Sequence, residues 1–368
     1  MKVTGVSWTS FRLPLRAPFR TAAGEITCRE GLILRLCTDA GVVGLGEASP
    51  HPTLEAEGLP EVEAALERLA PRLLGLRVEC LEPSPGPGIP PALACALDVA
   101  ACDALARARG LSVARLLSES VRASAPVNAT IAAESDNEAA TEAAAARAAG
   151  FGCVKLKVGM ARSLEDERRK VAAVRAALGP EIALRLDVNG AWGAEQAVLA
   201  IRSLAEFGLE LVEQPVAPGD LEGMARVRAA CGVPIAADED VTGAAAAARL
   251  LEGGAVDALV VKPMVVGGLR LAMQIAAMAR TAGAAAIVTT TLDAGVGTAA
   301  ALHLAAALPA KGPAHGLATG SLLAADVVAR PLAVRAGRMA LPEGPGLGVE
   351  LDEGALARYG GVAREVRW

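Results

Sequence analysis

The sequence predicts an α/β protein in which a parallel β/α barrel follows a smaller α+β domain. Two observations predict this fold. From Pro126 to about residue 330, short apolar runs alternate with alanine-rich helical segments, which is the pattern of parallel strands covered by helices. Before Pro126, strand-like stretches come first and helical stretches follow them, which is typical of an α+β unit.

The first 125 residues carry the pattern of the smaller domain. Strand-like stretches occupy Val3–Leu13, Gly31–Cys37 and Val42–Glu47, and a helical pattern follows at Glu61–Leu74. A proline-rich stretch at 83–91 precedes a second segment with apolar residues at helical spacing. We therefore expect a few antiparallel strands packed against helices.

Eight apolar runs carry the pattern of the barrel. They are Val127–Ile131, Cys153–Val158, Ala183–Val188, Glu210–Glu213, Pro234–Asp238, Ala258–Val261, Ala286–Thr291 and a weaker run at His315–Thr319. An open, doubly wound sheet would contain similar runs. However, ionisable residues stand at positions 157, 187, 213, 238 and 262, separated by 30, 26, 25 and 24 residues. One such residue per repeat is expected when the strand ends converge on one pocket, which favours a (β/α)8 barrel or a close variant.

Composition and charge exclude several classes of protein. The 368 residues are 53% hydrophobic, which is enough for a large core and excludes a disordered chain. The net charge of -5, from 36 basic and 41 acidic residues, argues against a nucleic-acid-binding or membrane-binding surface. Seven cysteines without a C-x-x-C pair indicate reduced thiols. With no signal-peptide pattern at the N-terminus, we expect a soluble, cytoplasmic protein.

The alternation of side chains along the second barrel run points its lysines inward. In a strand, Leu156 and its apolar neighbours share one face, and Lys155 and Lys157 share the other. Because helices cover the outside of a barrel, the apolar face must lie outward. An edge strand with a solvated lysine face is the alternative, but it needs an exposed sheet face that the surrounding helices would cover.

Similar alternation places carboxylates at the ends of the next three runs, at Asp187, Glu213 and Asp238, and a lysine, Lys262, at the end of the sixth. An aspartate there often caps the following helix, but glutamate is a poor N-cap and lysine cannot accept the hydrogen bond. Three carboxylates in one barrel mouth would repel one another unless a cation lay between them, and oxygen ligands suit Mg²⁺, or Mn²⁺, better than zinc.

Lysines beside such a cation have a chemical use. A neighbouring cation and a second lysine disfavour the ammonium form, so we expect the lysine pKa values to fall towards the working pH. A lysine with a lowered pKa can act as a general base. The arrangement predicts removal of a proton from the carbon next to a carboxylate, with the metal stabilising the resulting dianion.

Five motifs in this order resemble the enolase superfamily, and within it the muconate-lactonizing-enzyme subgroup, over nearly the whole chain. They are Lys155-Leu156-Lys157, Asp187-Val188-Asn189-Gly190, Val212-Glu213-Gln214-Pro215, Ala237-Asp238-Glu239 and Val261-Lys262-Pro263. The resemblance implies a capping domain at 1–125, a (β/α)7β TIM-like barrel at 126–330 and a segment at 331–368 that returns to the capping domain.

The same resemblance implies roles for single residues. The Mg²⁺ ligands would be Asp187, Glu213 and Asp238. Lys157 and Lys262 would face each other across the substrate, with Lys155 supporting the enolate oxygen. Asn189 and Glu239 would orient these groups.

The seventh run is where the subgroup distinguishes its substrates. The candidates here are Thr290, Thr291, Asp293 and Gly295, because hydroxyls and the N–H groups that open a helix form a suitable seat for a carboxylate. Dipeptide epimerases of the subgroup carry Asp-x-Asp in this region. Gly295 stands where the second aspartate would fall, which counts against that activity.

Residues 15–24 resemble the mobile capping-domain loop that closes over the substrate in this subgroup. Its Arg20 suits an acidic substrate, although a solvated charged loop would have the same composition. The histidine base of the racemase and sugar-dehydratase branch is missing from Ala284–Asp293.

Together, the seventh run and residues 315–320 most resemble o-succinylbenzoate synthases. The expected reaction is therefore dehydration of 2-succinyl-6-hydroxy-2,4-cyclohexadiene-1-carboxylate, a step of menaquinone synthesis. Alternatives within the subgroup are a muconate-type cycloisomerase, an N-acylamino acid racemase and a dipeptide epimerase. A non-catalytic carboxylate-binding barrel is the alternative from another class. In each case the partner is a small carboxylate, and the sequence leaves a homo-oligomer possible.

Overall fold

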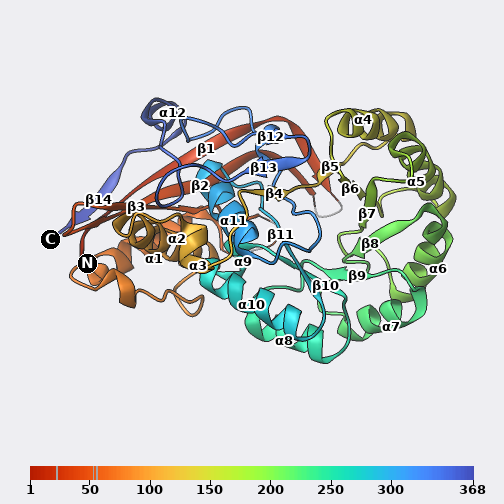
Figure 1. Ribbon diagram of the computed structural model, residues 1–368, viewed down its shortest axis with the longest axis horizontal. Helices are drawn as coiled ribbons and strands as arrows, with labels where there is room; N and C mark the ends of the chain where they lie inside the picture. The colour runs from red at the N-terminus through yellow and green to blue at the C-terminus, as the bar shows by residue number, and fades with distance from the viewer. Residues whose placement is uncertain (22–23, 53, 55–56) are drawn as a thin grey trace.

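The computed structural model describes residues 1–21, 24–52, 54 and 57–368. A curled parallel sheet surrounded by helices forms one part of the molecule, and an antiparallel sheet with its own helices forms the other (Figure 1).

The antiparallel sheet contains both ends of the chain. Its strands, in spatial order, are β14 (Arg364–Arg367), β1 (Val3–Thr21), β2 (Gly24–Thr38) and β3 (Val43–Ala48). Its helices and the C-terminal helix are α1 (Leu59–Leu73), η1 (Val78–Cys80), α2 (Pro91–Ala108), α3 (Val113–Leu117) and α12 (Glu353–Tyr359). Pairing of β14 with β1 returns the C-terminal segment to the first strand of the chain.

Helix α2 packs unusually close to β3. A Cβ atom added at Gly44 would lie 2.0 Å from the carbonyl oxygen of Ala100, and one at Gly46 would lie 2.0 Å from that of Ala96. Only glycine allows this approach. The small residues of α2 thereby seat the helix on the sheet, and most of its side chains are buried.

The parallel sheet has seven strands in sequence order. They are β5 (Ala129–Ile131), β6 (Cys153–Lys157), β7 (Ala183–Asp187), β8 (Leu209–Glu213), β9 (Ile235–Ala237), β10 (Ala258–Val261) and β11 (Ala285–Val288). The intervening helices are α4 (Asp136–Ala148), α5 (Leu164–Leu178), α6 (Ala194–Leu204), η2 (Ala205–Phe207), α7 (Leu221–Cys231), α8 (Ala244–Glu252), α9 (Pro263–Val266) and α10 (Leu269–Thr281), followed by α11 (Gly295–Ala307). Helices α4 to α8 lie outside the curled sheet (Figure 1).

The weaker eighth run is not a strand. His315 and Gly316 instead form single bridges, to Val127 and Thr289. The N–H of Gly316 donates to Val288 O at 2.9 Å, and the N–H of Asn128 donates to His315 O at 2.9 Å. This short segment therefore contacts both edge regions of the seven-stranded sheet.

A small third sheet connects the two parts. Its strands, in spatial order, are β12 (Val334–Arg335), β13 (Arg338–Ala340) and β4 (Ser124–Pro126), and η3 (Gly320–Leu322) precedes them in the C-terminal region. Through β13, the segment after the last barrel run pairs with the residues that lead into β5.

The two faces of the parallel strands have the predicted character. Outward residues such as Leu156 and Leu186 are fully buried in the main core against the helices. A separate apolar cluster, which includes Val260 and Ile287, fills part of the space inside the curled sheet. The charged side chains of the strands share this inner face, so that side-chain alternation alone decides which residues meet there.

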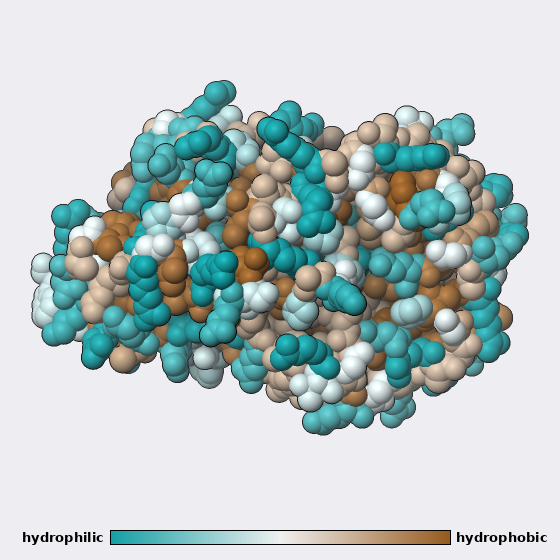
Figure 2. Space-filling model, viewed as in Figure 1, coloured by the Kyte–Doolittle hydropathy of each residue, from teal (hydrophilic) through white to brown (hydrophobic). Residues whose placement is uncertain are grey.

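On the face shown in Figure 2, apolar side chains appear as separate areas among hydrophilic ones. Among the described residues, no helix is long and apolar enough to cross a bilayer.

Candidate active site

The ionisable side chains predicted from the strand ends meet at one edge of the curled sheet. Register pairs Lys157 with Asp187 and Asp187 with Glu213, so these three lie at one level across β6, β7 and β8. Asp238 and Lys262 directly follow β9 and β10, and their side chains form an ion pair. The sequence pattern therefore predicted a real cluster.

Lys155 and Lys157 both contact the carboxylates. The Nζ atom of Lys155 lies 2.9 Å from Asp187 Oδ2 and 2.9 Å from Glu213 Oε1. The Nζ atom of Lys157 lies 2.6 Å from Asp187 Oδ2. Both lysines thus point inward, as the alternation of β6 requires.

Three buried carboxylates form a candidate metal centre. Asp187, Glu213 and Asp238 each offer one oxygen, and these oxygens lie within 4.8 Å of one another. Burial, and then the neighbouring Asp187, raise the pKa of Glu213 to about 8. Close packing of like charges away from water is unfavourable unless a cation compensates it. The donor set fits a hard divalent cation, which prefers oxygen ligands.

At Lys155 and Lys262, contacts with carboxylates oppose the fall in pKa that the sequence analysis expected. Burial opposes the charged form of Lys155, but the carboxylates of Asp187 and Glu213 outweigh it and raise its pKa. For Lys262, burial is likewise outweighed by Asp238, and the pKa is raised. The expected fall depended on a bound cation and a second lysine, and it stays a prediction. The carboxylates that touch each amine act in the opposite direction.

Asn189 links the two sides of the cluster. Its Oδ1 accepts a hydrogen bond from Lys157 Nζ at 2.7 Å, and its Nδ2 donates to Glu239 Oε1 at 2.9 Å. The backbone of Asn189 is left-handed, with φ 49°, a conformation that asparagine adopts more readily than most residues. Asn189 and Glu239 therefore lie where the sequence suggested, beside the lysine and the carboxylates.

Gln214 is a residue that the sequence reasoning quoted but gave no role. It is fully buried, its Oε1 accepts from the N–H of Asp238 at 2.9 Å, and its Nε2 donates to Asp240 Oδ2 at 2.7 Å. Gln214 thereby fixes the backbone at Asp238. In the sequence, Gln214 directly follows Glu213, which ends β8. An amide next to a carboxylate at a strand end was the feature that could have identified it.

The cluster borders a pocket of about 110 Å³ between the strand ends and the part of the molecule that holds the antiparallel sheet. Its lining consists of Phe19, His51, Leu54, Thr130, Lys155, Lys157, Asn189, Asp238, Glu239, Lys262, Thr289, Thr290, Thr291, Leu292, Gly316 and Thr319. Lys157 and Lys262 thus line the same small space. Hydroxyls line it as well, and Thr290 Oγ1 lies 2.7 Å from Thr319 Oγ1.

Thr289 adds a polar group that the sequence analysis did not select. Its Oγ1 is buried and has no hydrogen-bond partner among the described residues. A hydroxyl in that state is available to a polar ligand. Thr289 stands one residue before the two threonines that the sequence analysis selected. The choice of pocket residues therefore depended on where β11 was expected to end.

Comparison with known proteins agrees with this geometry. Residues 138–355 match the family described as enolase C-terminal domain-like. The chain belongs to the enolase superfamily. Its relatives include a chloromuconate cycloisomerase of Cupriavidus necator, 32% identical over 98% of this chain and 99% of that protein. An o-succinylbenzoate synthase of Thermobifida fusca is 36% identical over 88% of this chain and 83% of that protein.

A solved structure shows the same fold over the full length. The N-succinyl Arg/Lys racemase from Bacillus cereus superposes with a TM-score of 0.91 at 26% identity, covering 100% of both chains. Dipeptide epimerases and muconate cycloisomerases are also among the relatives, which places the chain in the muconate-lactonizing-enzyme subgroup. These enzymes perform different reactions, so membership of the superfamily does not decide the reaction.

In this superfamily member, the segment after β11 differs from the prediction. Thr290 and Thr291 line the pocket, but Asp293 does not; its Oδ1 accepts from Thr291 Oγ1 at 2.6 Å. Gly295 lies outside the pocket, and its N–H donates to Asp326 Oδ1 at 2.8 Å.

The predicted carboxylate seat at the start of α11 is wrong because the protein fills it. Glu47 Oε1 accepts from the N–H of Ala294 at 2.8 Å, and Glu47 Oε2 accepts from the N–H of Gly297 at 2.7 Å. The helix N-terminus thus binds a carboxylate of β3, in the antiparallel sheet, which leaves no room there for one from a substrate.

Arg20 lies near the tip of the β1–β2 hairpin, opposite Glu25 in the register, and its side chain lies outside the described part of the structure. The expected loop at 15–24 is strand up to Thr21, and residues 22–23 are outside the described residues. Phe19, from the same hairpin, lines the pocket.

Of the three histidines, only His51 lines this pocket. Burial, and then the charge of Arg29, lower the pKa of His51 to about 3. His303 is buried in α11 and accepts a hydrogen bond from the N–H of Ala114 at 3.1 Å. His315 lies outside the pocket, and its Nδ1 accepts a hydrogen bond from the N–H of Val288, the last residue of β11.

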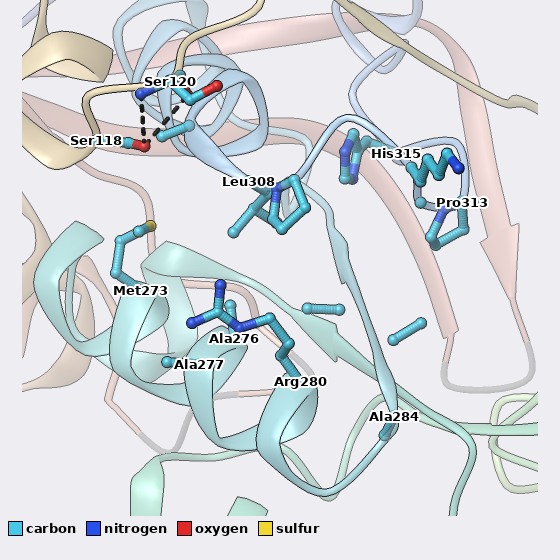
Figure 3. A pocket seen from close by; sticks show the side chains of 16 residues that line it. Ser118, Ser120, Met273, Ala276, Ala277, Arg280, Ala284, Leu308, Pro313 and His315 are labelled. Atoms are coloured by element: carbon cyan, nitrogen blue, oxygen red, sulfur yellow. Dashed lines mark hydrogen bonds between the residues drawn. The ribbon is translucent and has the colours of Figure 1, made fainter.

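A larger cavity, of about 530 Å³, lies at the N-terminal end of β11. Met273 and Arg280 of α10 lie on one side of it, and Leu308, Pro313 and His315 lie on the other (Figure 3). None of the described residues that line it is an aspartate or a glutamate. Its volume exceeds that of the charged pocket, but its described lining offers no carboxylate to hold a metal, and the Nδ1 atom of His315 already accepts a hydrogen bond from the N–H of Val288.

Proposed function

We propose that this protein removes a proton from the carbon next to a carboxylate in a magnesium-dependent reaction, and that the reaction is syn-dehydration of 2-succinyl-6-hydroxy-2,4-cyclohexadiene-1-carboxylate to o-succinylbenzoate. The observation that carries the proposal is that Lys157 and Lys262 line one small pocket beside three buried carboxylates. An amine on each side of a bound carboxylate suits proton transfer at the carbon between them.

In this proposal Asp187, Glu213 and Asp238 would hold the divalent cation. When bound, the cation would supply positive charge to the substrate carboxylate as negative charge develops on it. The three oxygens are near enough to share one ion, and their burial excludes competing water.

Lys157 would act on both sides of the elimination. As the free amine, it takes the proton from the ring carbon that bears the carboxylate. The electron pair left on that carbon forms a double bond to the neighbouring ring carbon, whose C–O bond breaks. The Lys157 ammonium then returns the proton to the departing hydroxide, so the products are o-succinylbenzoate and water. One residue serves both transfers only if both groups leave from the same face.

Lys262 and Lys155 would remain ammonium ions. Their carboxylate neighbours raise both pKa values, which favours the charged form. A fixed positive charge beside the forming enolate stabilises it without a proton transfer. Asn189 would orient Lys157 through the 2.7 Å hydrogen bond to its Nζ atom.

The relative with the highest identity among those described above, at 36%, is named as an o-succinylbenzoate synthase, which supports this choice of reaction. Menaquinone synthesis in the cytoplasm is the setting that the proposed substrate implies. We also propose that residues 315–316 complete a (β/α)7β barrel, which their hydrogen bonds to Val288 and Asn128 support.

Racemisation of an N-acylamino acid is the second candidate. The same two lysines could act there as an acid and a base on opposite faces, and the N-succinyl Arg/Lys racemase matches the chain over its full length. Deuterium from the solvent at the amino-acid α-carbon would identify that activity.

The test is an activity panel with purified protein and Mg²⁺. It compares o-succinylbenzoate formation with α-proton exchange in N-succinylamino acids and in dipeptides. Lys157→Ala should lower the dehydration rate at least a hundredfold, since general acid–base groups contribute about 10²–10⁴. Lys311→Ala, an exposed lysine at the opposite end of the sheet, is the matched control and should retain the rate.

Retained dehydration in Lys157→Ala would rule out the proposed role of this lysine. Binding of Mg²⁺ and a dicarboxylate with no exchange of any α-proton would instead support a non-catalytic barrel.

A further inference from the structure

A buried polar junction joins the capping sheet to the segment that follows β11. Arg29 of β2 is 2% exposed, and its guanidinium donates to Ser49 O at 2.7 Å, to Pro50 O at 3.1 Å and to Leu292 O at 3.4 Å. Glu47 of β3 is 1% exposed. We call Arg29 and Glu47 the capping clamp.

Glu47 binds the segment that follows β11 at residues 294–297, just beyond the carbonyl of Leu292 that Arg29 contacts. Its carboxylate accepts hydrogen bonds from Ser49 Oγ at 2.6 Å and from the N–H groups of Ala294 and Gly297. Burial, and then the nearby Asp293, raise the pKa of Glu47 to about 8. A buried charge in this position is therefore costly, and an apolar interface would avoid that cost.

Between the two clamp residues the backbone is strained. Leu292 has φ 64°, in the left-handed region that a leucine rarely occupies. Backbone strain of this kind persists only where surrounding contacts determine the conformation. Strained residues are found most often at functional sites. Here Arg29 contacts the carbonyl of Leu292, and Glu47 contacts the N–H of Ala294 two residues later.

The clamp touches both segments that form the capping-side wall of the pocket. His51 and Leu54 follow Ser49 and Pro50, whose carbonyls Arg29 binds, and both line the pocket. On the other side, Leu292 itself lines the pocket and is only 5% exposed. One guanidinium thus fixes two pocket walls that are about 240 residues apart in the chain.

We propose that Arg29 and Glu47 are positioning residues that hold Leu292 in its left-handed conformation and so preform the part of the pocket wall that Leu292 contributes. The proposal rests on the proposed function insofar as this pocket is the one that binds substrate. Without the clamp, Leu292 relaxes, and the threonine-bearing turn before it moves with it. Only a fraction of the molecules then has the wall in place to bind substrate.

A positioning role has a kinetic signature. If the binding-competent fraction falls, the apparent affinity falls in proportion, while molecules that do bind substrate react normally. KM should therefore rise and kcat should change little. A general loss of stability would do the opposite, since fewer folded molecules lower the apparent kcat at an unchanged KM.

The first experiment measures KM and kcat for Arg29→Met, Arg29→Lys and Glu47→Gln. We expect Arg29→Met to raise KM about tenfold or more, the scale on which a strained non-glycine conformation is destabilised, with kcat within about threefold of the wild type. Arg29→Lys keeps the charge but loses the planar set of donors and should give a smaller rise. Arg12→Met, an exposed arginine of the neighbouring strand β1, is the control and should change neither constant.

A double-mutant cycle tests the role of strain directly. Leu292→Gly removes both the side chain and the cost of positive φ. If the clamp acts by imposing this conformation, Arg29→Met should raise KM less than threefold in the Leu292→Gly background, against about tenfold in the wild-type background. An equal rise in both backgrounds, or a fall in kcat with an unchanged KM, would overturn the proposal.

A readout without substrate separates this proposal from the proposed function. Crystals of Arg29→Met, or of Arg29→Lys if the first variant does not fold, should show Leu292 outside the left-handed region. Glu47→Gln should speed hydrogen exchange at the amides of Ala294 and Gly297. An unchanged Leu292 would refute the clamp, whatever the activity. A wild-type protein inactive across the panel would refute the proposed function and leave this test intact.

Discussion

The two ends of the parallel sheet differ in what they bury. At the C-terminal ends of the strands, a pocket of about 110 Å³ holds lysines, carboxylates and threonine hydroxyls. At the N-terminal end of β11, a cavity of about 530 Å³ is lined by several alanines and other small or apolar residues, together with two serines, His315 and the exposed Arg280 and Lys311. The larger cavity thus has no carboxylate among its described lining residues, whereas the smaller pocket has two.

We infer from this contrast that buried charge, and not cavity volume, identifies the end of the sheet where the proposed reaction takes place. Burying a carboxylate is expensive, and a fold keeps several together only where a cation or a reaction compensates the cost. At the other end, packing of small side chains leaves space without such a cost. The predictions below test the contrast, beginning with the C-terminal end.

The largest effect is expected at the carboxylate triad. Glu213→Gln removes one charged ligand, so Mg²⁺ should bind much more weakly and α-proton exchange should fall about 10³-fold or more, since metal stabilisation of a developing charge is worth several kcal/mol. In the wild type, EDTA should abolish activity and Mg²⁺ should restore it. Calorimetric titration with Mg²⁺ and exchange rates measure the two effects.

Thermal unfolding offers a second measurement of the same site. Mg²⁺ at a hundred times its Kd should stabilise the wild type by about 2.7 kcal/mol and the Glu213→Gln variant far less. Glu252→Gln, an exposed acid of α8, is the matched control and should respond like the wild type. Activity that survives complete removal of metal would contradict the assignment of the triad.

An intermediate effect, on stability instead of activity, is expected at His315, which lines the larger cavity. Burial, and then the charges of Arg122 and Arg185, lower the pKa of His315 from 6.5 to about 3. As the pH falls from 6.5 towards 3, the unfolded chain takes up a proton that the folded chain refuses, so stability is lost in that range. His315 should account for about 2 kcal/mol of the loss between pH 7 and pH 5.

Urea unfolding of the wild type and of His315→Gln at both pH values measures this effect. The variant should be less stable at pH 7, because its hydrogen bonds change, but the difference between the two pH values should shrink by about 2 kcal/mol. The same pH difference in both proteins would show that His315 titrates normally in the folded state.

The smallest effect is expected at the rim of the larger cavity. Arg280→Ala together with Lys311→Ala should leave kcat and KM within about twofold of the wild type, since surface substitutions away from a site cost little. Steady-state kinetics check this. A large loss of activity would break the contrast between the two ends and would give the N-terminal cavity a function.

Much of the site was predictable because strands have a simple period. Alternation within β6 assigns Lys155 and Lys157 to the inner face, and parallel strands end at the same edge, so Asp187 and Glu213 had to be neighbours. These inferences need only local geometry. They hold in the structure, where the carboxylates and lysines are in contact.

The segment after β11 was harder to predict. Asp293 and Gly295 were expected to serve the substrate, yet the first holds Thr291 and the second is bound by Asp326. Local sequence shows that a helix N-terminus can bind a carboxylate, but not which carboxylate arrives there. That question depends on residues distant in the chain.

By itself, the sequence of this superfamily member determined the order of strands and helices, the inward direction of the charged side chains and the identity of the carboxylate triad, since each follows from periodicity over a few residues. Only the tertiary structure decided that Glu47 occupies the start of α11, that Arg29 binds Leu292, and that His315 and Gly316 form bridges instead of a strand. Those contacts join segments far apart in the chain, and their energies depend on how closely two independently formed surfaces pack, which no local pattern records.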